Sequence, residues 1–150
     1  MITLRPPEPA ELPAISALCL RSKAYWGYDA SFMAACVDEL TLSEEELGSS
    51  EIVVALDDQT IMGMAQIVIS GGEADLQKLF VDPDHMGKGA GRLLMAWTVT
   101  AARDGGAETL LIEADPYAEA FYERHGAKRV GEIASGSISG RVLPLMRLDL

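Results

Sequence analysis

The sequence predicts an α/β fold in which a mixed, mainly antiparallel central sheet is flanked by helices on both faces. Strand-like and helix-like segments alternate along all 150 residues, with no repeat, linker or low-complexity segment between them. Two of the strand-like segments, 51–56 and 61–70, flank the turn-rich stretch DDQT and therefore read as an antiparallel hairpin. An apolar content of 49% and a charged content of 23% are ordinary for a globular protein. We therefore expect a single domain, 1–150, around one core.

The first third of the chain reads as one short strand followed by helices. The strand ITLR is stopped by Pro6 and Pro7, and apolar residues recur at helical spacing from Glu11 to Ser22. Asp29 is placed to cap a second helix. Ser43 and Glu46 have the spacing of a capping box that opens a short third one.

The remaining segments alternate more regularly. The strand ADLQKLFV ends at Pro83, and a glycine-rich loop then leads into a helix that stops at Gly105 and Gly106. After the strand ETLLIEA, a further helix has Asp115 at its cap, Pro116 at its first position and Gly126 beyond its end. Two more strands are expected near 129–133 and 142–150.

The net charge and the cysteines argue against several classes of protein. The net charge of −11 argues against nucleic acid as a partner, because phosphate binding relies on basic patches, and suits a cationic small molecule. Cys19 and Cys36 have no metal-ligand spacing and read as buried thiols in a reducing compartment, with no metal site. No apolar run approaches the ~18 residues of a membrane span, and no signal peptide is expected. These features predict a cytoplasmic protein that binds no membrane.

The segment VDPDHMGKGAGRLLM, residues 81–95, contains three closely spaced glycines before a strongly apolar helix. A strand, a glycine loop and a helix N-terminus together form an anion site, because free backbone N–H groups and the helix dipole both favour negative charge. The loop does not match a Walker-type phosphate loop, since Lys88 precedes the second glycine. It does not match a dinucleotide fingerprint either, since the third glycine would fall at Arg92.

The stretch LFVDPDHMGKGAGRLLM resembles the acyl-CoA motif of the GNAT acetyltransferase superfamily, and DPYAEAFYERHGAKRVGE resembles the second signature of that family. The two stretches occur in the family's order and at its spacing, and the likeness covers nearly the whole chain. The resemblance implies the GNAT fold and acetyl-CoA as cosubstrate. It also implies an N-acetyltransferase that transfers an acetyl group to a primary amine.

The resemblance assigns cosubstrate contacts to specific positions. The strand before the loop would bind the pantetheine arm through its backbone, and the loop would hold the pyrophosphate. Two departures from the family pattern affect affinity: Met86 replaces a residue that can bond phosphate, and Asp115 stands where the family usually has Asn. The cofactor-binding residues expected on this basis are Leu79, Phe80, Val81, Gly87, Lys88, Gly89, Ala90, Gly91, Arg92 and Asp115.

The chemistry needs a base for the amine and an acid for the departing thiolate. The resemblance assigns the acid to Tyr122. Glu113, at the end of its strand, is the candidate base, with Glu73 and Asp75 as rivals. No Cys–His or Ser–His–Asp set points to a covalent intermediate, so direct transfer in a ternary complex is expected.

The acceptor side is less defined by the sequence. Tyr25, Trp26 and Tyr28 lie between two helices and read either as an aromatic wall or as core. Arg141, after several serines, reads either as a carboxylate-binding group or as part of a solvated turn. The acceptor is therefore a small amine, with or without a carboxylate, or a protein amino group. A non-catalytic acyl-CoA-binding module remains the alternative, and the protein is expected to be a monomer or a homodimer.

Overall fold

The computed structural model describes residues 1–150 and contains one seven-stranded sheet in the order β1-β2-β3-β4-β5-β7-β6. All neighbouring strands are antiparallel except β4 and β5, which are parallel. The mixed, mainly antiparallel sheet expected from the sequence is therefore confirmed. The strands are β1 (Ile2–Arg5), β2 (Glu51–Asp57), β3 (Thr60–Ser70), β4 (Glu73–Val81), β5 (Thr109–Glu113), β6 (Lys128–Ala134) and β7 (Val142–Asp149).

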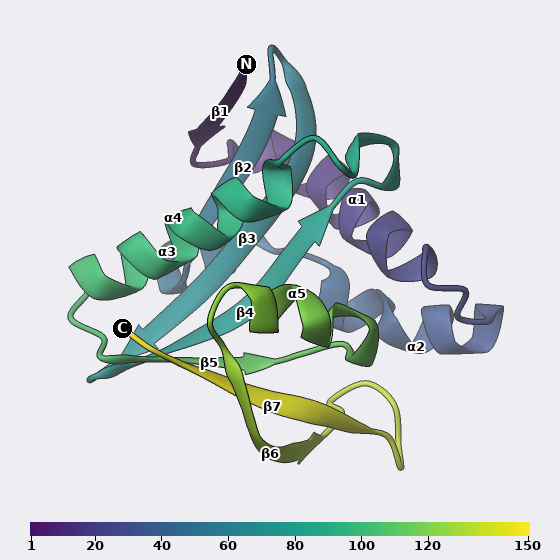
Figure 1. Ribbon diagram of the computed structural model, residues 1–150. Helices are drawn as coiled ribbons and strands as arrows, with labels where there is room; N and C mark the ends of the chain where they lie inside the picture. Colours follow the sequence, from purple (N-terminus) through teal and green to yellow (C-terminus); the bar gives the residue numbers. More distant parts are fainter.

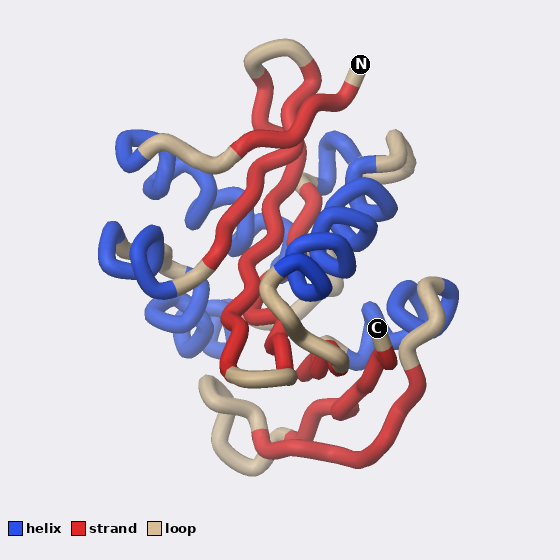
Figure 2. The backbone as a smooth tube through the Cα atoms, turned by 90° about the vertical axis from the view of Figure 1, so that its left-hand side faces the viewer, coloured by secondary structure: helices blue, strands red, loops and turns tan.

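Helices cover both faces of this sheet, as Figure 2 shows with the sheet between two helical layers. One face carries α1 (Leu12–Ala24), α2 (Ala30–Leu40) and α3 (Glu44–Ser49), and the other carries α4 (Ala90–Asp104) and α5 (Glu119–Arg124). Short 3-10 helices precede α1 at Pro9–Glu11 (η1), follow β4 at Pro83–His85 (η2) and precede α5 at Pro116–Ala118 (η3). No helix is long and apolar enough to cross a membrane.

Each face has its own core. On one side, the helical spacing of Leu12, Ile15 and Cys19 in α1 buries all three side chains against β2 and β3. On the other side, Met95 of α4 and Tyr122 of α5 pack over β4, β5 and β7. The two cores fix the helices on opposite faces of one sheet.

Two local expectations need correction. Ser43 does not cap α3 in the expected capping box: its hydroxyl donates to the Glu46 carboxylate at 3.5 Å and accepts no backbone N–H. The helix expected after Asp115 begins as the 3-10 helix η3 and becomes α-helical only at Glu119, although Asp115 does cap it, by accepting from the N–H of Tyr117, and Pro116 does stand at its first position. Asp29 does cap α2, through a 2.8 Å bond from the N–H of Phe32.

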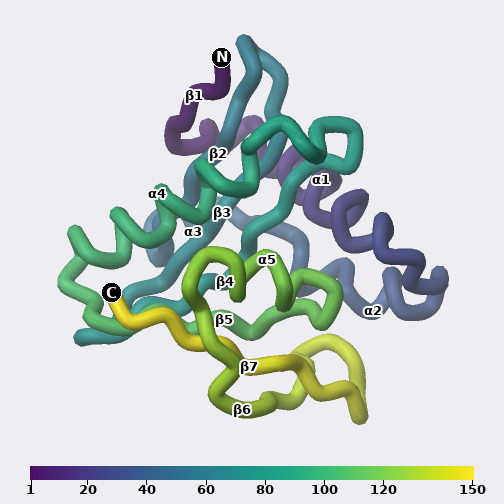
Figure 3. The backbone as a smooth tube through the Cα atoms, viewed as in Figure 1, coloured from purple at the N-terminus to yellow at the C-terminus, as the bar shows by residue number.

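The sheet splits between its two parallel strands. Pairing of β4 with β5 runs only from Glu73↔Thr109 to Leu76↔Ile112, whereas β4 continues to Val81. A register shift in β3–β4 at Gln66/Ile67 leaves Gln77 as an extra residue at the point of divergence. Figures 1 and 3 show β4 rising away from β5 toward the start of α4. The backbone of residues 77–81 is thus left without a neighbour on its β5 side.

Candidate functional site

A cavity of about 530 Å³ occupies the split between β4 and β5, and its volume is typical of ligand-binding pockets. Its walls come from the free part of β4, the first turn of α4, the end of β5, α5, and the loop between β6 and β7, with α1 and α2 on the opposite side. The cavity extends between two ends. After the roles that the resemblance predicts, we call the end at the β4–α4 loop the donor end, and the end at the C-terminus of α2 and the β6–β7 loop the acceptor end.

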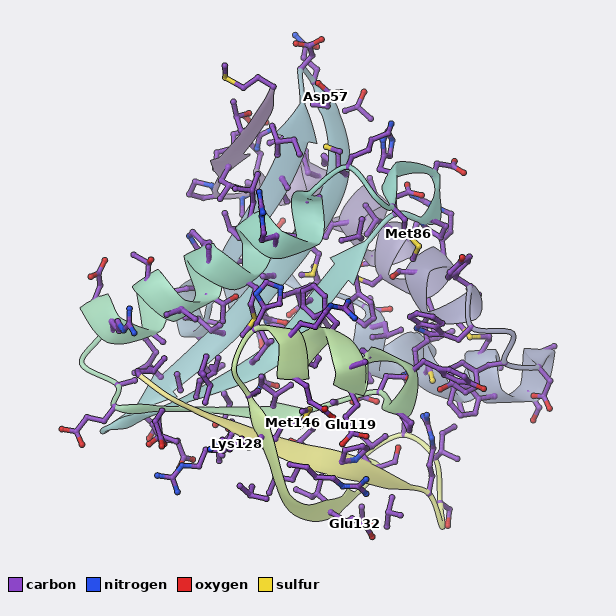
Figure 4. The ribbon with its side chains drawn as sticks, viewed as in Figure 1. Asp57, Met86, Glu119, Lys128, Glu132 and Met146 are labelled. Carbon is purple, nitrogen blue, oxygen red and sulfur yellow. The ribbon has the colours of Figure 1, made fainter.

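The donor end is shaped by glycine. Gly87 and Gly89 have φ values of +78° and +91°, a left-handed backbone conformation that side-chain-bearing residues rarely adopt. Gly89 is the N-cap of α4, so the N–H groups of the first turn have no helical acceptor. Figure 4 shows Met86 in this loop, at the exit from β4.

Gly91 has a different reason for being glycine. A Cβ at this position would lie 3.2 Å from Cε1 of Phe121, so the residue permits close packing of α4 on α5. The expected role of Gly91 in cofactor binding stays a prediction. Its N–H still belongs to the first turn of α4.

Cations gather at the donor end. Arg92 and Arg124 line the cavity there, and Lys88 is exposed with its Nζ 3.3 Å from Nδ1 of His85. Burial and the charges of Arg124 and Arg92 lower the pKa of His125. The donor end therefore combines free N–H groups with positive charge, a fit for a pyrophosphate.

The candidate acid and base lie on opposite faces of the split. Tyr122 is 6% exposed and lines the cavity. Burial, followed by the charge of Asp115, raises the pKa of Tyr122. Glu113 also lines the cavity, and strand alternation places it opposite Leu110 and Ile112, which face α5. Burial and then the charges of Asp75 and Glu39 raise the pKa of Glu113.

A polar network joins four segments next to the acceptor end. Lys23 Nζ lies 2.6 Å from Oδ2 of Asp115, and the Tyr28 hydroxyl donates to the same carboxylate at 2.9 Å. Arg141 donates to the Tyr28 hydroxyl at 2.6 Å and lies 3.7 Å from Asp115. Burial raises the pKa of Asp115, but bonds from Lys23 and the Tyr117 N–H outweigh it, so the pKa lies below its ordinary value.

Several residues singled out from the sequence as binding residues already have partners within the protein. Arg141 lines the cavity but already has two partners, and its guanidinium also lies 5.0 Å from the centroid of the Tyr28 ring. Tyr28 is not part of the cavity wall, because its ring stacks on Phe32 at 3.9 Å. Asp115 lines the cavity with both oxygens engaged. Its contact with pantetheine stays a prediction.

The structure also separates the three aromatic residues that the sequence left open as an aromatic wall or as core. Trp26 lines the cavity and stacks on Tyr117 at 5.3 Å, whereas Tyr25 is 56% exposed and lies outside the wall. Tyr117 was not singled out from the sequence, because a tyrosine after Pro116 carries no signal of its partner on α1. The aromatic wall thus consists of Trp26 and Tyr117.

Sequence reasoning also missed Glu39 and Lys23. Glu39 lines the cavity from the last turn of α2. A signal for it exists, since Glu39 follows Phe32 and Cys36 by seven and three residues and so shares their helix face. Lys23 offers no such signal, because its partner Asp115 lies 92 residues away.

The sequence is similar to a family model and to a curated protein. The family model described as an acetyltransferase (GNAT) domain matches residues 19–136. An uncharacterised N-acetyltransferase of Bacillus subtilis, YjcF, is 30% identical over 94 residues, which are 60% of this chain and 67% of that protein.

Solved structures share the fold at lower sequence identity. The PaiA N-acetyltransferase of Thermoplasma acidophilum, solved in complex with coenzyme A, has a TM-score of 0.84 and 18% identity, covering 100% of this chain and 99% of the other. A GCN5-related N-acetyltransferase from Rhodopseudomonas palustris has a TM-score of 0.82 and 22% identity, over 99% and 95% of the two chains. YncA of Salmonella typhimurium, solved with acetyl-CoA, has a TM-score of 0.71 and 18% identity, over 99% and 94%.

Proposed function

The chain belongs to the GNAT acetyltransferases, which use acetyl-CoA as cosubstrate, and we propose that it acetylates a primary amine by direct transfer within a ternary complex. The amine is that of a small molecule or of a protein. The observation that carries this proposal is the position of Tyr122 and Glu113, which face one cavity from the two sides of the β4–β5 split.

The residues present suit the cosubstrate. Leu79, Phe80 and Val81 pair with β3 but have no partner on the β5 side, where their backbone would hold the pantetheine arm. The N–H groups of residues 87–92 would hold the pyrophosphate, with Arg92 and Lys88 adding charge. Acetyl-CoA supplies the acetyl group as a thioester. Met86 offers no hydrogen bond to phosphate, so the donors at this end are the backbone N–H groups and the nearby cations.

Each of the two candidate catalytic residues carries out one of the two proton transfers of the reaction. Glu113 accepts the proton that the amine nitrogen loses as the new N–C bond forms, directly or through water. Tyr122 donates its phenolic proton to the sulfur as the C–S bond breaks, so that the products are the N-acetylated amine and free CoA. The raised pKa of Tyr122 keeps the phenol protonated at neutral pH, and the raised pKa of Glu113 makes it a better proton acceptor.

Replacement of Tyr122 by Phe tests this assignment. The ring and its packing in the core stay, while the proton donor is lost, so turnover should fall on the order of 10²-fold. The rate is measured as thiol release from acetyl-CoA with an accepted amine, and CoA affinity by titration calorimetry should stay within about twofold.

Tyr25→Phe is the matched control, because it removes the same hydroxyl from a ring outside the cavity wall. Its turnover should stay close to that of the unmodified protein. If Tyr122→Phe and Tyr25→Phe turn over at the same rate, Tyr122 has a packing role and the proposed acid is wrong.

The two cysteines support a reducing compartment. Both Cys19 and Cys36 are buried and free, with no disulfide between them. We therefore propose a cytoplasmic location. Whether the protein is a monomer or a homodimer stays a prediction.

A further inference from the structure

The chain leaves β4 toward the donor end through a buried carboxylate. Asp82 is 7% exposed and lies between Val81, the last residue of β4, and η2. Its Oδ1 accepts a hydrogen bond from the N–H of Asp84 at 3.1 Å, and its main-chain carbonyl accepts from the N–H of His85 at 2.8 Å. The N–H of Asp82 donates to the carbonyl of Met62 in β3 at 2.7 Å. These bonds fix the direction in which the chain leaves the sheet.

The second oxygen of this carboxylate connects the junction to α1. Nη2 of Arg21 donates to Oδ2 of Asp82 at 2.7 Å. α1 is a firm support for Arg21, because Ile15 and Cys19 are fully buried in the core between α1 and the sheet. Burial raises the pKa of Asp82, but the bonds from Arg21 and from the Asp84 N–H outweigh it, so the pKa lies below its ordinary value. The carboxylate is therefore ionised and paired at neutral pH.

The loop that follows η2 has almost no hydrogen bonds of its own. None of the N–H groups of residues 87–89 donates to a backbone carbonyl, and the N–H of Met86 makes only a 3.5 Å bond to the carbonyl of Pro83. The two left-handed glycines, Gly87 and Gly89, leave the backbone free to adopt other conformations. The conformation of this loop thus depends on its two anchored ends, which are η2 on one side and α4 on the other.

Arg21 and Asp82 lie behind the cavity wall. Neither residue lines the cavity, whereas His85, Met86 and Gly87 do. Figure 1 shows the segment between β4 and α4 next to α1, where this ion pair joins them. A buried carboxylate needs a partner, and here the partner comes from an element 61 residues away in the sequence. Any effect of the pair on a ligand must therefore act through the position of the loop.

We propose that Arg21 and Asp82 are positioning residues, which hold the β4–α4 loop in the conformation that receives the pyrophosphate of the cosubstrate. The inference rests on the proposed function, since it assumes that the N–H groups of residues 87–92 bind the pyrophosphate. The ion pair fixes η2 against α1, and η2 in turn fixes the start of the loop. The free N–H groups then converge before the ligand arrives, so less conformational freedom is lost on binding.

Two acyl donors separate this role from a general contribution to stability. Acetyl-CoA contains the pyrophosphate, whereas S-acetylpantetheine has the same thioester and arm and ends before it. Arg21→Met leaves the Asp82 carboxylate buried without its cation, so η2 must shift to expose it to water. We expect kcat/KM for acetyl-CoA to fall about fivefold, mainly through KM, while kcat/KM for S-acetylpantetheine stays within about twofold.

A second substitution tests the cause of this loss. Asp82→Asn keeps an oxygen that can accept from the Asp84 N–H but removes the charge. Added to Arg21→Met, it should restore at least half of the lost kcat/KM for acetyl-CoA, because no unpaired charge is then buried. Arg21→Lys keeps the cation and should retain most of the activity with both donors.

Arg147→Met is the matched control. The Arg147 side chain is 50% exposed, against 53% for Arg21, and it is paired with Asp149 at 2.9 Å. Arg147 does not line the cavity. This variant loses an arginine of the same exposure and an ion pair of similar length, so kcat/KM should stay within about twofold for both donors.

Four outcomes overturn the inference: Arg21→Met lowers kcat/KM equally for both donors, it changes neither, Asp82→Asn restores nothing, or Arg147→Met lowers the ratio as much as Arg21→Met. If no amine is acetylated, the dissociation constants of CoA and of pantetheine, measured by titration calorimetry, replace the two rates. A loss of affinity in Arg21→Met that is confined to CoA would support the inference while the proposed function fails. Equal losses, or none, would overturn the inference as well.

Discussion

The donor end of the cavity is formed by one continuous segment, whereas the acceptor end is assembled from distant parts of the chain. Between Leu79 and Arg92, β4, η2 and the first turn of α4 follow each other directly and supply nearly all of the donor end. The acceptor end combines Glu39 of α2, Glu113 of β5 and the β6–β7 loop. A network from Lys23 through Asp115 and Tyr28 to Arg141 holds these segments together.

This difference indicates that residues of the acceptor end can be substituted without affecting the donor end. The donor end depends on backbone conformation, so most side chains there can vary as long as the glycines remain. The acceptor end depends on side chains that meet only in the folded protein, so single substitutions can change its charge without disturbing the donor end. In a fold that binds one cosubstrate but different acceptors, the acceptor site must be able to change while the cosubstrate site stays the same.

The largest effect on cosubstrate binding is expected at the donor end, from Gly89→Asp. At φ +91° the new side chain is strained, and its carboxylate stands at the N-terminus of α4 where a pyrophosphate would bind. The dissociation constant of CoA should rise at least tenfold, as measured by titration calorimetry on protein whose folding is verified by circular dichroism.

Gly89→Asn separates strain from charge, because it has nearly the same shape and no charge. The Asp variant should bind CoA more weakly than the Asn variant, and the gap should narrow as salt is raised. Equal affinities at low salt would contradict an anion site at this position.

The same division explains how far the sequence could predict the structure. The strands, the helices and the donor loop follow from local signals, such as the Pro83 stop and the glycines before α4. The partners of Arg141 could not be predicted, because Tyr28 lies 113 residues away in the sequence. Nor could the packing role of Gly91, since it depends on where α5 places Phe121. Local sequence signals therefore predict the helices and strands. Contacts between side chains that are distant in the sequence can be identified only from the structure.

A smaller effect is expected in the pH dependence of the acceptor end. Glu113 must be deprotonated to act as a base, so kcat should fall as the pH is lowered through its pKa. Because burial and the charges of Asp75 and Glu39 raise that pKa, the midpoint should lie above the ordinary value of 4.5. Asp75→Asn removes one of these negative charges and should move the midpoint of the kcat profile to lower pH.

Glu39→Gln should shift the midpoint in the same direction but by less, since Asp75 has the larger influence on Glu113. Profiles are recorded with acceptor and acetyl-CoA at saturation. A midpoint that Asp75→Asn leaves in place would show that another group controls the acid limb, and would remove Glu113 as the proposed base.

The smallest effect on specificity is expected from Arg141→Met, which decides between the two roles of this residue. In its first role, Arg141 belongs to the polar network and balances the negative charge of Asp115 together with Lys23. Its side chain is 18% exposed. Its loss should lower the free energy of unfolding by about 1 kcal/mol, measured by urea denaturation, because one partly buried charged hydrogen bond disappears. The ratio of kcat/KM for 5-aminopentanoate to that for pentylamine should then change less than about twofold. If that ratio instead falls about tenfold, Arg141 binds a substrate carboxylate, as one interpretation of the sequence proposed, and the acceptor end reads both signs of charge.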